Sequence, residues 1–310
     1  MLLNLSAESL VPVDMTASAE FASLLESATD LGIQHDPGAR YRSRQTVVRG
    51  IRLHFLEWGD PNAPPIVLLH GGNQSAHSWD LVSLHLADRF HVYALDQRGH
   101  GDSEWSREVD YSVRAKADDV AAFVVDQGIA RPTVFGHSMG GAVAMRAALS
   151  GLEMRSLVLV DTGPELSQKG IKVVHDFVAS NVEFDDLDTF LDNVAKYDRF
   201  RTRDHIARTV KYNMMRRADG KYVSKVDHRR FTSPAEPPAT LDEVRSIACP
   251  VLLIRGGESE VLEADAAQRL VEALPHAELI TVAGAGHNVH GANTPGFLEA
   301  VRPFLATVAG

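Results

Sequence analysis

Cysteine is nearly absent from this sequence of 310 residues, which contains only Cys249. A single cysteine can form no disulfide within the chain and no zinc site built from cysteines. Cys249 stands directly before Pro250 and the apolar run VLLIRG, so we expect a buried thiol at the edge of a strand. Disulfide-rich and cysteine–zinc proteins are therefore excluded.

Long apolar runs and an excess of positive charge are also missing. No stretch of 18 or more apolar residues occurs, so no transmembrane helix is expected. The N-terminus MLLNLSAESL lacks the basic start and long apolar middle of a secretory signal, so we expect a cytoplasmic protein. The 31 Lys and Arg against 41 Asp and Glu give a net charge of −10, which disfavours nucleic acid as a partner.

Short apolar runs separated by helical patterns are what the sequence does contain. Near-continuous apolar runs are typical of parallel strands buried on both faces. Hydrophobic residues make up 45% of the chain, enough for a packed core. The alternation predicts an α/β fold with a mostly parallel central sheet flanked by helices. The expected strands are a hairpin around Arg49-Gly50 and the runs at 66–69, 92–95, 133–135, 157–160, 251–254 and 278–282. The expected helices lie at 79–88, 112–127, 139–150, 264–274 and 294–307.

The domain organisation follows from where this alternation begins and breaks. Residues 44–163 and 247–310 form the predicted core. Residues 164–246 are highly charged and helical in pattern, which predicts a helical lid over a site at the carboxyl ends of the strands. SPAEPPAT at 233–240 reads as the linker back to the sheet.

Two parts of the chain allow alternative interpretations. The extension 1–43 carries an apolar helical stripe, which either caps its own domain or supports a homodimer. Its members are Phe21, Leu24, Leu25, Ala28 and Leu31. The segment 196–217 is strongly basic; a solvated helix face with local ion pairs is favoured, and a docking site for a substrate carboxylate is the alternative.

Ser138 is the strongest candidate for a chemical role. GHSMG at 136–140 fits G-x-S-x-G and lies between a strand-like run and a helical run, the context of a nucleophile elbow. The flanking glycines are expected because side chains at 136 or 140 would clash with the neighbouring helix and strand. A serine hydroxyl needs a base, and His287 stands in a glycine-rich loop after the last strand. His290 is the weaker candidate for the base.

The acid that orients the base is less clearly marked. The loop after VLLIRG offers Glu260 and Glu258, and Asp161 follows the earlier strand run LVLV. All three remain open on this reasoning, in that order of preference.

The strand run IVLL is followed by His70-Gly71-Gly72, where small residues let backbone N–H groups point at a developing oxyanion. We expect the N–H groups of Gly72 and Met139 to form the oxyanion hole. Asn73 is a possible third contributor and substrate contact, and Trp79 is expected to line the acyl pocket. His70 is interpreted as structural.

Taken in order, HGGN, LDQRGHGDS at 95–103, GHSMGG, LVLVDTGP and GAGHN resemble the motifs of the α/β-hydrolase superfamily over residues 44–310. The resemblance implies a carboxylesterase-like serine hydrolase that cleaves a small-molecule ester or related acyl bond through an acyl-enzyme. Such an enzyme requires no metal or organic cofactor. Loops of this family often carry Ser-Asp before two apolar residues, and Ser259-Glu260-Val261-Leu262 matches with Glu for Asp, which favours Glu260.

Other activities known in this superfamily are alternatives. Epoxide hydrolases and haloalkane dehalogenases use an aspartate nucleophile, which Ser138 argues against. Carbon–carbon hydrolases of the meta-cleavage-product type often show an HGGGPGA-like loop where this chain has HGGNQSA. Cofactor-free perhydrolases or haloperoxidases are hardly separated by sequence, and a non-catalytic ligand receptor is the most distant alternative.

Overall fold

The central feature is a twisted sheet whose described strands run in the order β1-β2-β3-β5-β4-β6-β7-β11-β12. The computed structural model describes residues 13–14, 19–229 and 239–308. Strands β5, β4, β6, β7, β11 and β12 are mutually parallel, whereas β1, β2 and β3 pair antiparallel at one edge. The strands are β1 (Val13–Asp14), β2 (Tyr41–Val48), β3 (Ile51–Trp58), β4 (Pro65–Leu69), β5 (His91–Leu95), β6 (Thr133–His137), β7 (Ser156–Val160), β11 (Val251–Gly256) and β12 (Ala277–Val282).

The predicted fold class is confirmed by this sheet. Each apolar run predicted as a strand forms one, and β5, β6 and β7 are buried at every position, as expected for parallel strands covered on both faces. The hairpin turns at Arg49 and Gly50, both with positive φ (51° and 75°), which matches the twist of the two strands. Cys249 lies two residues before β11 and is half-buried, less enclosed than expected.

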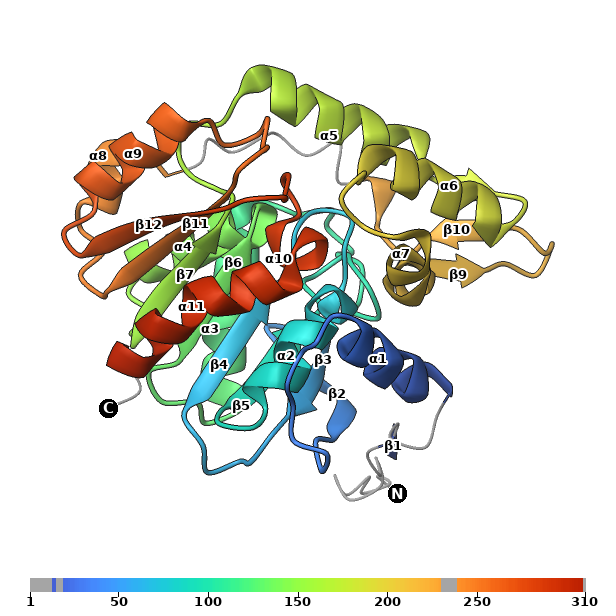
Figure 1. The fold of residues 1–310 in the computed structure, drawn as a ribbon, viewed down its shortest axis with the longest axis horizontal. Coiled ribbons are helices and arrows are strands. Elements are labelled where there is room, and N and C mark those ends of the chain that lie inside the picture. The colour runs from blue at the N-terminus through green and yellow to red at the C-terminus, as the bar shows by residue number, and fades with distance from the viewer. Residues whose placement is uncertain (1–12, 15–18, 230–238, 309–310) are drawn as a thin grey trace.

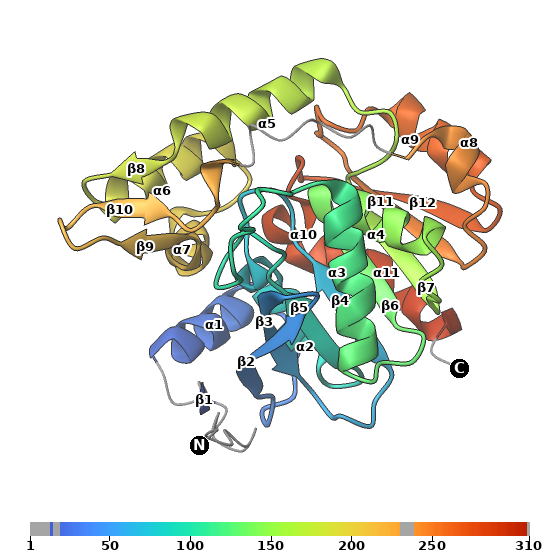
Figure 2. The same ribbon diagram turned by 180° about the vertical axis from the view of Figure 1, so that it is seen from behind.

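Helices cover both faces of the sheet (Figures 1 and 2). One apolar cluster joins one face to α1 (Ala19–Asp30), α2 (Asp80–Leu86) and α11 (Thr294–Val308). A second joins the other face to α3 (Val113–Asp126), α4 (Met139–Leu149) and α9 (Ala264–Ala273). The short helices α8 (Leu241–Val244) and α10 (Val289–Ala292) complete the core. None of the helices described is long and apolar enough to span a membrane.

A separate layer is inserted between β7 and β11 and extends over the core (Figure 1). It has its own small apolar cluster, which includes Phe184, Phe190 and Ile206. Its helices are α5 (Gln168–Ser180), α6 (Leu187–Tyr197) and α7 (Arg203–Val210), and its strands are β8 (Glu183–Phe184), β9 (Met214–Arg216) and β10 (Tyr222–Ser224). We call this layer the lid. Its three-stranded sheet was not expected, and most of the predicted linker 233–240 lies outside the described residues.

The N-terminal helix α1 packs on its own chain. Phe21 lies against Tyr41 and Trp58, with ring centroids 5.8 and 6.5 Å apart, and Leu24 and Ala28 are buried beside it. The helix also adjoins α2 of the core and α7 of the lid. Of the two sequence interpretations, the capping role is the one that this packing supports. A homodimer through the extension stays a prediction.

Candidate active site

Ser138 stands at a sharp turn between β6 and α4. Its backbone has φ 50° and ψ −116°, a strained conformation for a residue with a side chain. A Cβ atom at Gly136 would lie 2.5 Å from the carbonyl oxygen of Gly140, and one at Gly140 would lie 2.3 Å from that of Leu69. Only glycine fits at these two positions, so the motif is what lets the turn pack this closely.

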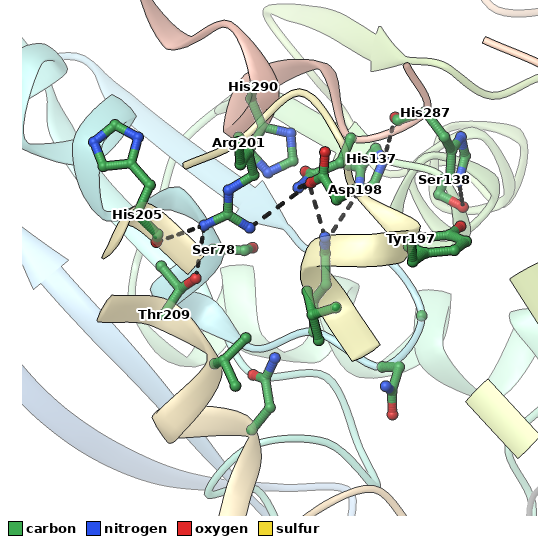
Figure 3. A pocket seen from close by; sticks show the side chains of 18 of the residues that line it. Ser78, His137, Ser138, Tyr197, Asp198, Arg201, His205, Thr209, His287 and His290 are labelled. Atoms are coloured by element: carbon green, nitrogen blue, oxygen red, sulfur yellow. Dashed lines mark hydrogen bonds and ion pairs between the residues drawn. The ribbon is translucent and has the colours of Figure 1, made fainter. Parts of the chain in front are cut away.

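A continuous chain of hydrogen bonds links Ser138, His287 and Asp161 (Figure 3 draws the first pair). Ser138 Oγ lies 2.9 Å from His287 Nε2, and His287 Nδ1 lies 2.7 Å from Asp161 Oδ2. Ser138 follows β6, Asp161 follows the adjacent β7, and His287 comes from the loop after β12. Because the carboxyl ends of parallel strands share one edge of the sheet, three residues distant in sequence meet there.

The Asp161 carboxylate is fully buried and held by two further donors. Oδ1 accepts from the backbone N–H of Gly256 at 3.0 Å, and Oδ2 accepts from the hydroxyl of Ser259 at 2.5 Å. A carboxylate held in this way accepts the Nδ1–H of His287. This leaves Nε2 free to accept the proton of Ser138.

The expectation that Glu260 orients His287 is corrected by this geometry. Glu260 and Glu258 are both exposed, and no hydrogen bond of the described residues joins either to His287. Glu258 instead accepts from the N–H groups of Gly284 and Ala285, at 3.3 and 2.9 Å. The loop after β11 turns Ser259 inward and its two neighbours outward. In the sequence, Asp161 is marked only by its position directly after a buried strand, β7. The structure shows that β7 is the neighbour of β6, the strand that precedes Ser138.

The expected oxyanion donors both line a cavity in front of Ser138. Met139 is the first residue of α4, where backbone N–H groups have no partner within the helix. Gly72 follows β4 closely and lines the same cavity. Asn73 also lines it, with a positive φ of 61° and its Oδ1 3.5 Å from the Ser224 hydroxyl of the lid.

Trp79 does not take the predicted place in the acyl pocket. Its indole is fully buried and is not part of the cavity wall. It stacks on His290 with ring centroids 3.8 Å apart and contacts Phe135 and Phe297 edge-on or tilted. Trp79 is therefore a core residue, and it is His290 that reaches the cavity.

Three further histidines are buried near the site, namely His137, His290 and His70. His137 Nε2 lies 2.9 Å from the carbonyl oxygen of His287, which braces the loop of the candidate base. Burial lowers the pKa of His137 well below its usual range. His290 has its pKa lowered to about 3 by burial, with the charges of Arg201 and His287 acting in the same direction. His70 accepts from the backbone N–H of Gln97 at 3.0 Å, consistent with a structural residue.

The cavity has a volume of about 330 Å³ and lies between core and lid (Figure 3). Its core side carries Ser138 and His287. The lid contributes an apolar part from α5 and α6 and a polar part from the segment that follows. These lid residues are Val174, Phe177, Val178, Phe190, Val194, Tyr197, Asp198, Arg201, His205, Arg208, Thr209, Val210 and Asn213. Sequence reasoning identified the basic segment but did not single out Arg201 and Arg208.

One group of residues in the described chain has the spacing of a metal site: His54, Asp96 and Asp102. Its ligand atoms are already used in hydrogen bonds. His54 Nδ1 lies 2.7 Å from Asp96 Oδ2, and the Asp96 oxygens accept from the N–H groups of Ala76 and Asp102. We interpret the group as a structural connection between β3 and the loop after β5.

Comparison with known proteins identifies the family. The model of the alpha/beta hydrolase family matches residues 66–300, about three quarters of the sequence. The chain belongs to this family. As a member it is an enzyme of the hydrolase class, and the esterase and hydrolase relatives below agree with that assignment.

Among relatives of this alpha/beta hydrolase is esterase Rv0045c of Mycobacterium tuberculosis, 29% identical over 303 residues, covering 95% of this chain and 98% of that protein. Its solved structure superposes with a TM-score of 0.78 at 27% identity, covering 94% of this chain and all of the other. The 2-(acetamidomethylene)succinate hydrolase of Mesorhizobium japonicum is 26% identical, covering 91% and 99%. An alpha/beta hydrolase structure from Novosphingobium aromaticivorans has a TM-score of 0.76 at 25% identity, covering 86% and 98%.

Proposed function

We propose that this hydrolase is a serine enzyme that cleaves a carboxylic ester, or a related acyl bond, through an acyl-enzyme intermediate. The observation that carries the proposal is the hydrogen-bond chain Ser138–His287–Asp161, whose serine opens into the cavity under the lid. The esterase named among the relatives favours an ester as the bond that is cleaved.

In the acylation step, Ser138 Oγ attacks the carbonyl carbon while His287 Nε2 takes the hydroxyl proton. Asp161 stabilises the imidazolium that forms and keeps its ring in place without itself taking the proton. The negative charge that develops on the carbonyl oxygen is bound by the N–H groups of Met139 and Gly72. Each such donor is worth roughly two to three orders of magnitude in rate.

The tetrahedral intermediate then collapses, and His287 gives its proton to the departing alcohol. In the second half of the reaction a water molecule takes the place of that alcohol. His287 removes its proton, the hydroxide oxygen bonds to the acyl carbon, and Ser138 leaves with the proton restored. The products are one carboxylic acid and one alcohol per ester and water consumed.

Covalent labelling by a fluorophosphonate probe tests the nucleophile. We expect the protein to be labelled at Ser138 and to turn over p-nitrophenyl esters of short acids. Ser138→Ala should abolish labelling and lower kcat by several orders of magnitude, because the residues of such a unit act together. Ser150→Ala, which changes an exposed serine at the other end of α4, is the matched control and should behave like the wild type. Absence of labelling in folded wild-type protein, or a loss of less than about tenfold in Ser138→Ala, would refute the proposal.

A further inference from the structure

The basic segment 196–217 divides into two kinds of arginine. Arg203 and Arg217 are half-exposed and pair with surface carboxylates, for example Arg203 with Asp188 at 2.7 Å. Arg201 and Arg208 turn inward, with side chains 10% and 5% exposed, and both line the cavity that contains Ser138. Local ion pairs on a solvated face therefore account for Arg203 and Arg217. They do not explain why Arg201 and Arg208 point into the cavity.

Arg208 forms a hydrogen-bonded ion pair with a carboxylate, whereas the ion pair of Arg201 is longer. Nη1 of Arg208 lies 3.1 Å from Asp80 Oδ2, so its charge is balanced in place. Nη2 of Arg201 donates to two neutral acceptors, the carbonyl oxygen of His205 at 2.8 Å and Thr209 Oγ1 at 2.9 Å.

The carboxylate nearest to Arg201 is engaged elsewhere. Asp198 Oδ2 lies 3.9 Å from Arg201 Nη1, beyond hydrogen-bond distance, and accepts instead from Asn288 Nδ2 at 3.1 Å. Burial and the charge of Arg208 lower the pKa of Arg201 to about 10, while Asp198 opposes the shift. Arg201 is therefore still a cation at neutral pH, and its ion pair with Asp198 is too long to be a hydrogen bond.

Further unpartnered polar atoms surround the same space. Nε of Arg201, Oγ of Ser78 and both ring nitrogens of His290 are buried without a hydrogen-bond partner among the described residues. All three residues line the cavity (Figure 3). Buried polar atoms are normally hydrogen-bonded, so the concentration of these atoms in one cavity indicates that a polar group of a ligand provides the missing partners.

We propose that Arg201 binds a carboxylate at the far end of the substrate's acyl group, so that the enzyme acts on half-esters of short dicarboxylic acids. The acyl chain runs inside the cavity from Ser138 to Arg201, along the apolar side chains of α5 and α6. This inference rests on the proposed function for the bond that is cleaved, but the binding of the carboxylate is independent of turnover. Arginine suits this role because its planar guanidinium matches a carboxylate in charge and geometry.

The first test measures binding without catalysis. Ser138→Ala protein is titrated by calorimetry with monomethyl succinate, glutarate and adipate, and with methyl butyrate, pentanoate and hexanoate as uncharged partners of equal length. One half-ester should bind about tenfold or more tightly than its uncharged partner, as a charge-assisted hydrogen bond provides. Adding Arg201→Gln should remove the preference, and adding Arg203→Gln, at an exposed arginine of the same segment, should keep it. Equal binding of both series, or a preference that survives Arg201→Gln, would overturn the proposal.

The second test separates recognition from a merely structural role of Arg201. With p-nitrophenyl half-esters, Arg201→Gln should lower kcat/KM by about tenfold or more, mainly through KM, and Arg201→Lys should recover part of the loss. With the uncharged p-nitrophenyl alkanoates both variants should lose less kcat/KM than with the half-esters, so that the preference for half-esters over alkanoates falls by about tenfold in Arg201→Gln. Equal losses on both series would assign Arg201 to the structure of the lid and refute the carboxylate site. Wild-type enzyme that is labelled by fluorophosphonate but does not prefer half-esters would refute this inference alone.

Discussion

The Asp161 carboxylate accepts hydrogen bonds from Gly256, Ser259 and His287. Three donors around one fully buried carboxylate fix its position and keep it an acceptor. In the proposed mechanism its negative charge stabilises the imidazolium of His287 when that cation forms. The exposed glutamates of the neighbouring loop have no comparable contact with His287.

Replacing Asp161 by Asn tests this assignment. The variant keeps the size of the side chain but presents an N–H to His287 or to its two other donors, which favours the wrong tautomer of the ring. We expect kcat to fall by roughly four orders of magnitude, as in other enzymes with this arrangement. Glu260→Gln, the matched change in the exposed carboxylate, should alter kcat by less than about twofold. If Glu260→Gln gave the larger loss in steady-state kinetics, the assignment of Asp161 would be wrong.

Two residues of the Ser138–His287–Asp161 chain carry a local signature in the sequence, and the candidate acid carries a weaker one. Ser138 is marked by the glycines that its turn requires, and His287 by a glycine-rich loop after the last strand. The only mark of Asp161 is its position directly after a strand, and its role depends on which strands are neighbours in the sheet. Only the order β6-β7-β11 shows that the end of β7 lies between the serine and the loop after β11. Trp79 was misplaced for a similar reason, since burial against His290 is a tertiary property.

At the scale of elements, long patterns were predictable and short ones were not. Helix α1 shows its apolar stripe in sequence, whereas the lid strands β8, β9 and β10 contain only two or three residues each. A run of that length has no period to detect, and its pairing depends on contacts formed within the lid. The stripe of α1 likewise did not reveal its partner, which is the core and α7 of its own chain.

Leu24→Ala tests whether α1 is an integral part of the fold. Leu24 is 2% exposed within the cluster that joins α1 to the sheet, so its truncation should lower the free energy of unfolding by about 2–5 kcal/mol. Glu26→Ala changes an exposed residue of the same helix and should stay within about 0.5 kcal/mol of the wild type. Urea unfolding provides the measurement. Near-equal stability of the two variants, or a change of oligomeric size with Leu24→Ala in light scattering, would instead indicate that this face contacts a second subunit.

For the whole molecule, the arrangement of layers followed from composition and pattern. Apolar runs buried on both faces require helices above and below, and the break in alternation after β7 located the lid. The polar character of the cavity between lid and core could not be predicted from composition and pattern. It depends on Arg201 and Arg208 facing inward while Arg203 and Arg217 face outward, which the charge pattern alone does not distinguish.

The same enclosure should make stability depend on pH through histidines, of which His137 and His290 are the most deeply buried and His205 is a further one with a lowered pKa. His137 and His290 are buried and uncharged, with pKa values lowered below the usual value of 6.5, to about 3 for His290. In the unfolded chain both bind a proton near pH 6.5, so the unfolded state gains protons first as the pH falls. Buried carboxylates with lowered pKa, such as Glu57 at about 2, add to the loss only below about pH 4.5, where the unfolded carboxyl begins to protonate.

Between pH 6.5 and 5 the buried histidines should therefore dominate the loss of stability. Each of these histidines changes the free energy of unfolding by up to about 1.4 kcal/mol per pH unit. The protein should be most stable above pH 6.5 and lose stability as the pH falls. His290→Phe keeps a ring stacked on Trp79 but removes the titrating group. As the pH falls, the free energy of unfolding of this variant should therefore decrease with a slope smaller than that of the wild type by up to about 1.4 kcal/mol per pH unit. His276→Phe, at an exposed histidine, should retain the wild-type slope. Urea unfolding at pH 7.5, 6.5, 5.75 and 5.0 measures the slopes, and an unchanged slope in His290→Phe would show that this ring is not kept neutral by its burial.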